Sequence, residues 1–366
     1  MPNKRVFYAC QAVAFDGYDE SADAPLGNSF AVAKGVQSIG ITTNFNLEQV
    51  FELGQIQIYE NIEGVPDVEV TIEKVFDGTA LLFALATPVA TNANNLSLVG
   101  RSKERCCVGL SVYDDGFDGV VDNTNNNTFT QEVLMKGLYV SSLSYNIPVD
   151  GPVTESITLV GNSKVHGAEN FMANAPNAYT VGGDDLSANQ KAAGGIQRRE
   201  NVDVGSSILP TALPGVDTDG TFVDSNGKPT AHVQNISIST DFSREDILEL
   251  GRKAPYYRAP NFPIEVTCDI EMIAIATDQI LAFEEGKQAG NVGTFNSAYT
   301  QAVADTISTG DNTPEEAIQI LLEDGTNFDL GTKNRLSSVT YGGGDSAGGN
   351  ATITYSYTNF NELEVS

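Results

Sequence analysis

The chain contains one sequence pattern twice, and this duplication limits the folds available to it. The segment from Gln37 to Gly54 returns as the segment from Gln234 to Gly251 at constant spacing. The matched positions are Gln37/Gln234, Ile39/Ile236, Ile41/Ile238, Thr43/Thr240, Phe45/Phe242, Glu48/Glu245, Glu52/Glu249, Leu53/Leu250 and Gly54/Gly251. Two later segments match in the same order, with Val68–Thr71 aligned to Ile264–Thr267 and Ser141–Tyr145 aligned to Ser337–Tyr341. Similarity kept in order over about a hundred residues predicts two copies of one structural unit, and such repetition is typical of assemblies.

The composition favours a β-rich protein with two domains of ordinary size. The 366 residues include no Trp and 35 Gly, and Val, Thr and Asn are frequent, which is typical of strands joined by many turns. A chain of this length can bury two cores. We expect repeat A within residues 1–164, an irregular connecting segment at 165–233, and repeat B at 234–366.

The charge argues against two classes of partner. The formal net charge is −28, whereas phosphate contacts to nucleic acids and binding to anionic membranes need Lys and Arg. No apolar run approaches the ~20 residues of a membrane helix. The apolar stretch from Lys4 to Ala14 is short and Gln11 interrupts it, so we expect a first strand there and not a signal peptide.

One pair of duplicated segments alternates between apolar and acidic residues. Val68, Val70 and Ile72 alternate with Glu69 and Glu73. The second copy alternates in the same way through Ile264, Val266, Cys268 and Ile270 on one side and Glu265, Thr267, Asp269 and Glu271 on the other. This period of two predicts strands with one face in the core and one acidic face in water.

Local capping signals predict a short helix in each repeat. Asn46 is placed as an N-cap with Gln49 reaching back, and Gly54 supplies the stop. In repeat B the equivalent signals are Ser243, Asp246 and Gly251. A third helix is predicted over Thr313–Leu322, which has Pro at its first turn and an apolar face.

Each repeat is predicted to end in a hairpin. Leu138–Tyr145 leads into Thr154–Val160, and Leu336–Tyr341 leads into Ala351–Tyr357 through a Gly-rich tip at 342–349. This tip is either an arm that orders against a neighbour or an exposed loop. The connecting segment at 165–233 is too long for an ordinary turn, so we expect it to be disordered or wrapped over a partner.

The sequence predicts no enzyme, no cofactor and no metal site. Cys10, Cys106, Cys107 and Cys268 contain no CxxC pair and favour buried thiols in a reducing compartment. The acidic run at 114–122 fails the EF-hand spacing, and no Gly-Lys-Ser/Thr follows Gly342–Gly344 as a P-loop would need. Pro255–Arg258 could stack a base or a sugar, but we favour a structural Tyr/Arg cluster.

Several of these segments resemble the tail-tube-type structural proteins of tailed bacteriophages. The resemblance lies in Gln37–Gly54, Ile58–Asn61, Val68–Lys74, Tyr139–Gly151 and Thr154–Gly161. It covers much of repeat A and parts of repeat B as a pattern, without a diagnostic motif. The family implies a β-sandwich whose strands join those of neighbours in an intersubunit β-barrel ring, with rings stacked into a hollow tube that conducts DNA.

The duplication suggests how many strands and how many chains such a ring would contain. If each repeat gives about four strands, six repeats give about 24, and a spacing of ~4.8 Å at a tilt near 45° gives a backbone radius of roughly 26 Å. After side chains are subtracted, a lumen of about 40 Å would admit duplex DNA about 20 Å wide. Three chains with two repeats each would then form a pseudo-hexamer.

The acidic strand faces have two possible places in such a ring. If Glu69, Glu73, Glu265 and Asp269 line the channel, they repel the DNA backbone and keep it from binding. If they lie on the outer surface, they only solubilise the particle.

The resemblance implies partners and a location. The partners are other copies of this chain and tail proteins such as sheath, terminator or baseplate, and the location is a virion tail assembled in the host bacterial cytoplasm. Two other classes stay open: another virion component (neck, baseplate or capsid-associated), or a secreted repeat module that binds glycans or calcium.

Overall fold

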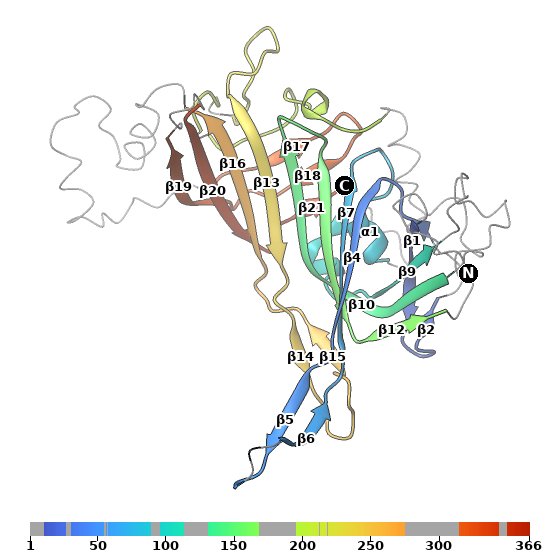
Figure 1. Cartoon of the computed structure of the whole chain (residues 1–366). Helices are drawn as coiled ribbons and strands as arrows, with labels where there is room; N and C mark the ends of the chain where they lie inside the picture. Colours follow the sequence, from blue (N-terminus) through green and yellow to red (C-terminus); the bar gives the residue numbers. More distant parts are fainter. Residues whose placement is uncertain are drawn as a thin grey trace, which may run out of the picture.

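The computed structural model confirms a mainly β protein built on one large antiparallel sheet (Figure 1). The residues that it describes are 11–26, 31–54, 56, 58–88, 96–112, 131–167, 195–211, 213–217, 219–274, 315–343 and 350–366. The continuous path of the sheet holds eight strands in the order β19-β20-β16-β13-β10-β11-β7-β4. Their bounds are β4 Val36–Asn44, β7 Asp67–Val75, β10 Gln131–Pro148, β11 Thr154–Gly161, β13 Val233–Asp241, β16 Glu265–Ile273, β19 Arg335–Gly342 and β20 Thr352–Phe360.

The duplication is visible in the strand order. Repeat A supplies β10-β11-β7-β4 and repeat B supplies β19-β20-β16-β13, which are the same four strands in the same order. The predicted hairpins are confirmed as β10–β11 and β19–β20. Even the irregularities repeat, since the pairing register shifts at Gln37 and its copy Gln234, and at Ser141 and its copy Ser337. β13 of repeat B pairs with β10 of repeat A, so the two units are joined head to tail in one sheet.

The pairing corrects one part of the sequence alignment. Thr43 and Thr240 are copies, and they lie opposite Val68 and Val266 respectively. The structural copy of Val68 is therefore Val266 and not Ile264, a shift of two residues along β16. A shift of two preserves the face on which each side chain lies, so the assignment of acidic and apolar faces is unaffected.

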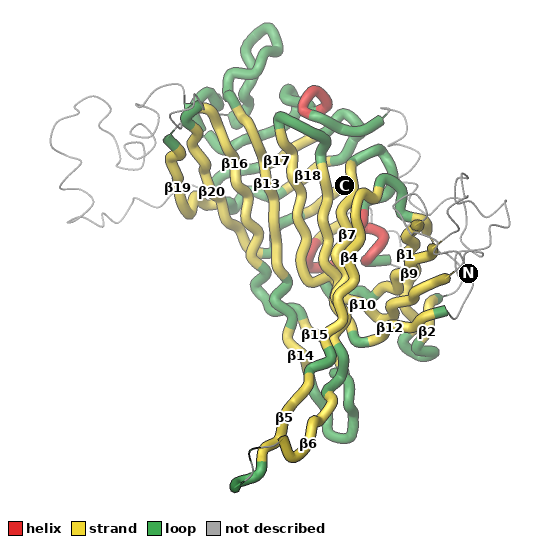
Figure 2. Tube along the Cα trace, viewed as in Figure 1, coloured by secondary structure: helices red, strands yellow, loops and turns green. Residues whose placement is uncertain are grey.

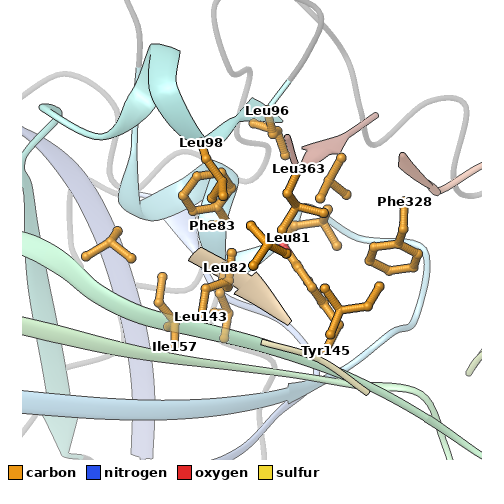
Figure 3. Close-up of a cluster of buried hydrophobic side chains, with 14 of the residues drawn as sticks. Leu81, Leu82, Phe83, Leu96, Leu98, Leu143, Tyr145, Ile157, Phe328 and Leu363 are labelled. Carbon is orange, nitrogen blue, oxygen red and sulfur yellow. The ribbon is translucent and has the colours of Figure 1, made fainter. Parts of the chain in front are cut away.

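The face opposite the acidic one carries the core (Figure 3). In repeat A the core on this face also contains side chains of α1 Leu82–Ala86, β1 Gln11–Asp19, β3 Ala31–Val32 and β9 Cys106–Val112. β2 Ala24–Pro25 pairs with β1, and β12 Ser163–His166 pairs with β10. A second, four-stranded sheet lies nearby and mixes the two repeats: β17 Gln319–Leu321, β18 Asn327–Asp329, β21 Glu364–Val365 and β8 Leu96–Ser97, with α2 Leu98–Arg101 following β8. The rings of Tyr145 on β10 and Phe328 on β18 meet at a centroid distance of 4.8 Å. This shared core ties repeat B to repeat A.

The described part of the connecting segment packs on its own chain. Gln197 is buried and its N–H donates to the Phe76 carbonyl, after which η4 (Arg199–Asn201) turns the chain. Leu209, Leu213 and Phe222 enter the core. The expectation of disorder or of a wrap over a partner is therefore wrong for residues 195–211, 213–217 and 219–233; residues 168–194 lie outside the described part.

The two predicted duplicated helices are wrong, because both segments form β-hairpins that project from the end of the sheet (Figures 1 and 2). The first hairpin, arm A, consists of β5 (Leu47–Phe51) and β6 (Ile58–Glu63), and the second, arm B, consists of β14 (Glu245–Ile247) and β15 (Tyr257–Ala259). The predicted caps Asn46 and Ser243 instead adopt positive φ angles of 44° and 43°, a backbone that redirects the chain and that Asn tolerates best. A projecting arm has no sheet face on which an amphipathic helix could dock, so cross-strand pairing takes its place.

The third predicted helix is also wrong. In the described part of Thr313–Leu322, Glu316 forms a bridge with Asn334 and the chain then enters β17. Ile318, Ile320 and Leu322 alternate into the core with a period of two. Tertiary pairing with Ile208 and β18 therefore outweighs the local helix signals.

Candidate functional site

The four acidic residues singled out in the sequence lie on one face of the continuous sheet. Glu69 and Glu73 are exposed on β7, while Glu265 is exposed and Asp269 half-buried on β16. Directly opposite residues share a face of a sheet, and one such row links the repeats through Glu73, Ser156, Ser144, Ser239 and Thr267. Thr267 lies two residues from both Glu265 and Asp269 on β16, so these three side chains share a face. All four carboxylates therefore point to the same side of the sheet.

Three further carboxylates lie on this face and were not singled out from the sequence. Glu271 is opposite Asn235 and is the structural copy of Glu73, Asp241 is opposite Ser142, and Asp67 is opposite Asn44 and two residues from Glu69 on β7. The alternation of β16 already contained Glu271, and the corrected alignment is the signal that pairs it with Glu73. The rest of the face consists mainly of Ser, Thr and Asn side chains.

The face has little positive charge to balance these acids. On the described strands β4, β7, β11, β13, β16, β19 and β20, the basic residue on this side is Arg335, whose Nη2 lies 2.7 Å from Oε1 of Glu315. Lys74 lies on the opposite face, where it is buried and bonded to Asp77 at 2.8 Å. A polyanion that approaches this face therefore meets net negative charge.

Among the described residues, most of the exposed large apolar side chains lie on the arms and their approaches. On arm A and its approach the exposed large side chains are Phe45, Leu47, Phe51, Leu53, Ile56, Ile58, Tyr59 and Ile62. On arm B they are Ile247, Leu248, Leu250 and Tyr256. Clusters of exposed large apolar side chains are typical of interaction sites.

Arm B is anchored to repeat A at its base, through Arg258. The Arg258 guanidinium lies 2.7 Å from Oδ1 of Asp67 on β7 and 3.1 Å from Oδ1 of Asp246 on the arm itself. Burial raises the pKa of Asp67, but hydrogen bonds from Asn46, Arg258 and Asn162 together with the Arg258 charge bring it below its usual value. Asp67 is thus held as a carboxylate at the foot of both arms.

A second anchor of arm B surrounds Tyr139. The guanidinium groups of Arg105 and Arg244 lie 4.7 Å and 4.8 Å from its ring centroid, and Tyr257 of arm B meets its edge at 5.7 Å. Arg244 also donates to the carbonyls of Val140 and Ser102. Tyr257 and Arg258 thus make structural contacts, as we favoured for the Pro255–Arg258 motif.

The remaining chemical motifs give no site in the described residues. Cys106, Cys107 and Cys268 are buried and unpaired, and burial raises the pKa of the Cys107 thiol to about 12. Within the described ranges, no group of three or more His, Cys, Asp or Glu residues is arranged to hold a metal ion. Cys10, the acidic run at 114–122 and most of the Gly-rich tip at 342–349 lie outside the described residues. The described helices include none long and apolar enough to cross a membrane.

No protein-family model matches the chain, and no curated protein matches it. Among solved structures, it is similar to a chain of the anti-feeding prophage baseplate, with 10% identity, a TM-score of 0.31, and coverage of 45% of this chain and 97% of that one. A chain of the sheath-tube complex of an extracellular contractile injection system in the extended state gives 12% identity, a TM-score of 0.29, and coverage of 46% and 95%. A chain of the anti-feeding prophage tube-terminating cap gives 11% identity, a TM-score of 0.30, and coverage of 46% of this chain and 95% of that one.

Proposed function

We propose that this chain is a structural subunit of a phage-tail-type tube, in which three copies form a ring and rings stack into a hollow conduit for DNA. The observation that carries the proposal is the head-to-tail addition of repeat B to repeat A within one sheet that has a single acidic face. A contact between two different edges can be repeated by a further copy, and such contacts close into a ring when the rotation per unit allows it.

The strand count supports six repeats per ring. Each repeat contributes four strands to the continuous path, so three chains contribute 24, and the backbone radius is roughly 26 Å at ordinary strand spacing and tilt. The lumen of about 40 Å that this leaves accommodates a DNA duplex of about 20 Å. One chain with two repeats would thus occupy two of the six positions in the ring.

The acidic face is proposed as the lining of the lumen. Glu69, Glu73, Glu265 and Asp269 would then surround the DNA with like charge, so that the duplex slides without binding. The core and the second sheet occupy the opposite face of the main sheet, which leaves the acidic side free to be the inner wall.

The tips of the arms are proposed as the stacking contact between rings. Leu53 and its copy Leu250 are both fully exposed, at 103% relative accessibility. Repeat B pairs with repeat A inside the chain, yet Leu250 at the tip of arm B remains exposed. A lateral neighbour therefore does not cover the tips, whereas a second ring placed along the axis would.

The wider setting follows the same proposal. Tail proteins such as sheath, terminator or baseplate would bind the ends or the outside of the tube, in a virion tail assembled in the host bacterial cytoplasm. The closest alternative is a neck, baseplate or capsid-associated protein, which would form a single ring and no tube. Neither role requires an enzymatic activity or a cofactor.

The test is electron microscopy of the purified protein across a concentration and salt series. Salt matters because the net charge of −28 opposes association and is screened within about 8–10 Å at physiological ionic strength. Hollow tubes whose top views show three chains per ring are expected. Six whole chains per ring would overturn the pseudo-hexamer, and a sample that remains monomeric or in single rings at high salt would overturn the tube.

The lumen assignment needs a separate experiment. Reversing Glu69, Glu73, Glu265 and Asp269 to Lys should leave ring formation possible but make the channel bind DNA, which slows ejection from particles that carry the variant. Unchanged DNA delivery by such particles would place these residues on the outer surface.

A further inference from the structure

The two ends of the sheet are copies of the two strands that join inside it. Within the described residues the path ends at β4 on one side and at β19 on the other. β4 is the copy of β13, and β19 is the copy of β10. Since β13 and β10 pair with each other inside the chain, the open edges of one chain are the two halves of a joint that the chain already makes once.

Burial differs between the copies at the positions that the internal joint covers. Phe242, at the end of β13, is 0% exposed, whereas its copy Phe45 is 63% exposed. Tyr145 on β10 is 1% exposed, since it pairs with Ile238 of β13 and also packs against Phe76 and Phe328, whereas its copy Tyr341 on β19 is 48% exposed. The chemistry at each pair is the same, so the exposed copy lacks a neighbour that the buried copy has.

The open edge of β4 also lacks the features that normally protect an edge strand. Free edges usually carry charged residues, proline or a short length that discourages pairing with another chain. β4 is a nine-residue strand, Val36–Asn44, without a charged residue or a proline. In a chain with a net charge of −28, a long neutral edge favours pairing with another strand.

We infer that β4 of one chain pairs with β19 of a second copy, antiparallel, in the register of the internal joint between β13 and β10; this rests on the proposed function for its ring. The internal pairs are Ser142 with Asp241, Leu143 with Thr240, Ser144 with Ser239, Tyr145 with Ile238 and Asn146 with Ser237. Copy for copy, the pairs between chains are Ser338 with Asn44, Val339 with Thr43, Thr340 with Thr42, Tyr341 with Ile41 and Gly342 with Gly40.

The chemistry of the joint follows from these pairs. Tyr341 and Ile41 meet on the core side, where Tyr145 and Ile238 are both buried. The Phe242 N–H donates to the Ser141 carbonyl at 2.8 Å, so the Phe45 N–H donates to the carbonyl of the copy of Ser141, which is Ser337. Thr42 and Thr340 meet on the acidic side of the sheet without adding charge.

The internal joint also fixes which of these pairs lie closest. Hydrogen bonds from Phe242 N–H to Ser141 and from Val149 N–H to Gln234 flank the pairs Ser142/Asp241 and Pro148/Asn235. These are therefore non-hydrogen-bonded pairs, with Cα atoms about 4.5 Å apart, and Ser144/Ser239 has the same parity. Cysteines at such a separation can form a disulfide.

Site-directed oxidation of cysteine pairs tests the register. One chain carries Thr42→Cys, a second carries Thr340→Cys, and the two are mixed at assembling concentration, treated with copper phenanthroline and run on a non-reducing gel. The matched positive control is Ser144→Cys with Ser239→Cys in one chain, which places the same pair in the internal joint. The register control is Thr42→Cys mixed with Ser338→Cys, and the wild-type chain reports on its native cysteines.

The same samples are imaged by electron microscopy, so ring and tube formation is scored separately from disulfide formation. Each outcome therefore separates this inference from the proposed function. We expect a covalent dimer from Thr42→Cys with Thr340→Cys, at least tenfold faster than from the register control. A chain that carries both substitutions should give a ladder of disulfide-linked oligomers on the gel, and the largest oligomer should contain three chains. Rings or tubes without this dimer, while the internal control oxidises fully, would overturn the edge pairing and leave the tube proposal standing.

Two further outcomes are equally decisive. A rapid dimer in a sample that forms no rings or tubes supports the edge pairing and overturns the tube. Neither assembly nor dimer at high concentration and high salt overturns both. Phe45→Ser provides an independent variant, for which we expect at least a tenfold loss of self-association, whereas unchanged self-association would contradict the inference.

Discussion

The strands β13 and β4 share a sequence pattern but differ in surroundings. β13 lies between β16 and β10, and Phe242 at its end is buried. β4 pairs with β7 alone among the described strands, and Phe45 at its end is exposed. The local residues are nearly the same, so the difference shows that burial at this position depends on a neighbouring repeat and not on the repeat itself.

The largest expected effect separates the two phenylalanines. Phe242→Ser should lower the free energy of unfolding by about 3–5 kcal/mol, since it leaves a cavity and a hydroxyl in the internal joint. Phe45→Ser should change it by less than about 0.5 kcal/mol, because the side chain is already in water. Denaturant unfolding under conditions where the wild-type chain is monomeric gives both values.

Sedimentation of the same two variants completes the test. Phe45→Ser should be a stable monomer that fails to associate, and Phe242→Ser should be a destabilised chain. Equal losses of stability in the two variants would mean that Phe45 is packed within its own chain. This result would contradict the conclusion that Phe45 lacks a neighbour that Phe242 has.

A second comparison concerns the core faces of the two repeats. Glu155 on β11 is buried and accepts hydrogen bonds from the Leu82 and Phe83 N–H groups at 2.7 Å and 2.9 Å. These are the first N–H groups of α1, whose N-cap residue Leu81 offers no side-chain acceptor. Burial raises the pKa of the Glu155 carboxyl, although these two hydrogen bonds oppose the rise. The structural copy of Glu155 is Ile353, because Leu159 and Tyr357 lie opposite the copies Val70 and Cys268.

Glu155→Ala should therefore cost about 2–3 kcal/mol of unfolding free energy, because two buried N–H groups lose their acceptor. Glu155→Gln should cost about half as much, since one amide oxygen still accepts a hydrogen bond. The control Ile353→Val in repeat B should cost about 0.5–1.5 kcal/mol through lost methylene packing alone. Thermal unfolding that ranks Glu155→Gln below Glu155→Ala in stability would contradict the capping role.

The alternation in the sequence predicted much of this fold correctly, and its errors have physical causes. A period of two identifies the acidic and core faces of β7 and β16, but a shift of two residues leaves that pattern unchanged. The alignment of Val68 with Ile264 was therefore wrong although Glu69, Glu73, Glu265 and Asp269 share a face. Glu155 is in phase with Ile157 and Leu159, so the alternation of β11 already places it on the core face. Its hydrogen-bond donors, the Leu82 and Phe83 N–H groups of α1, come from a distant segment that the pattern of β11 does not reveal.

The arms show the limit of local signals. Asn46 and Ser243 are good N-caps, yet the same residue types also initiate turns, and here they adopt positive φ. The choice between helix and hairpin depends on whether a sheet face is present to receive a helix, which the sequence of the segment does not encode. Which edges stay open depends likewise on the path of the whole chain.

A third comparison contrasts Asp67 in repeat A with its structural copy Glu265 in repeat B. Asp67 pairs with Arg258 of arm B, and its pKa lies below the ordinary value. A depressed folded pKa contributes stability that is present above the unfolded value, about 3.9 for Asp, and that is lost as the pH falls through the folded value.

Asp67→Asn should therefore cost up to about 1 kcal/mol at pH 6, a small value because the Asp67 side chain is 44% exposed. The difference from the wild-type chain should shrink toward zero as the pH falls through the folded pKa of Asp67, below about 3.9. Thermal melts between pH 6 and pH 2.5 measure it, with Glu265→Gln as the control, since Glu265 has no ion pair in the described part of the chain. A difference that grows on acidification would reverse the sign and contradict the anchor.

The smallest expected effect lies on the acidic face, where the two repeats should behave alike. Glu73 and its copy Glu271 sit opposite Ser38 and Asn235 at the same height of the sheet. Glu73→Gln and Glu271→Gln should each change the unfolding free energy by less than about 0.5 kcal/mol, since neither side chain is buried in the core. Each should also weaken the salt dependence of self-association, because one like charge is removed. If either variant costs more than about 1 kcal/mol, that carboxylate supports the fold of its own repeat; if both are nearly neutral, the acidic residues are dispensable for folding, as a lining that serves only the assembled particle would be.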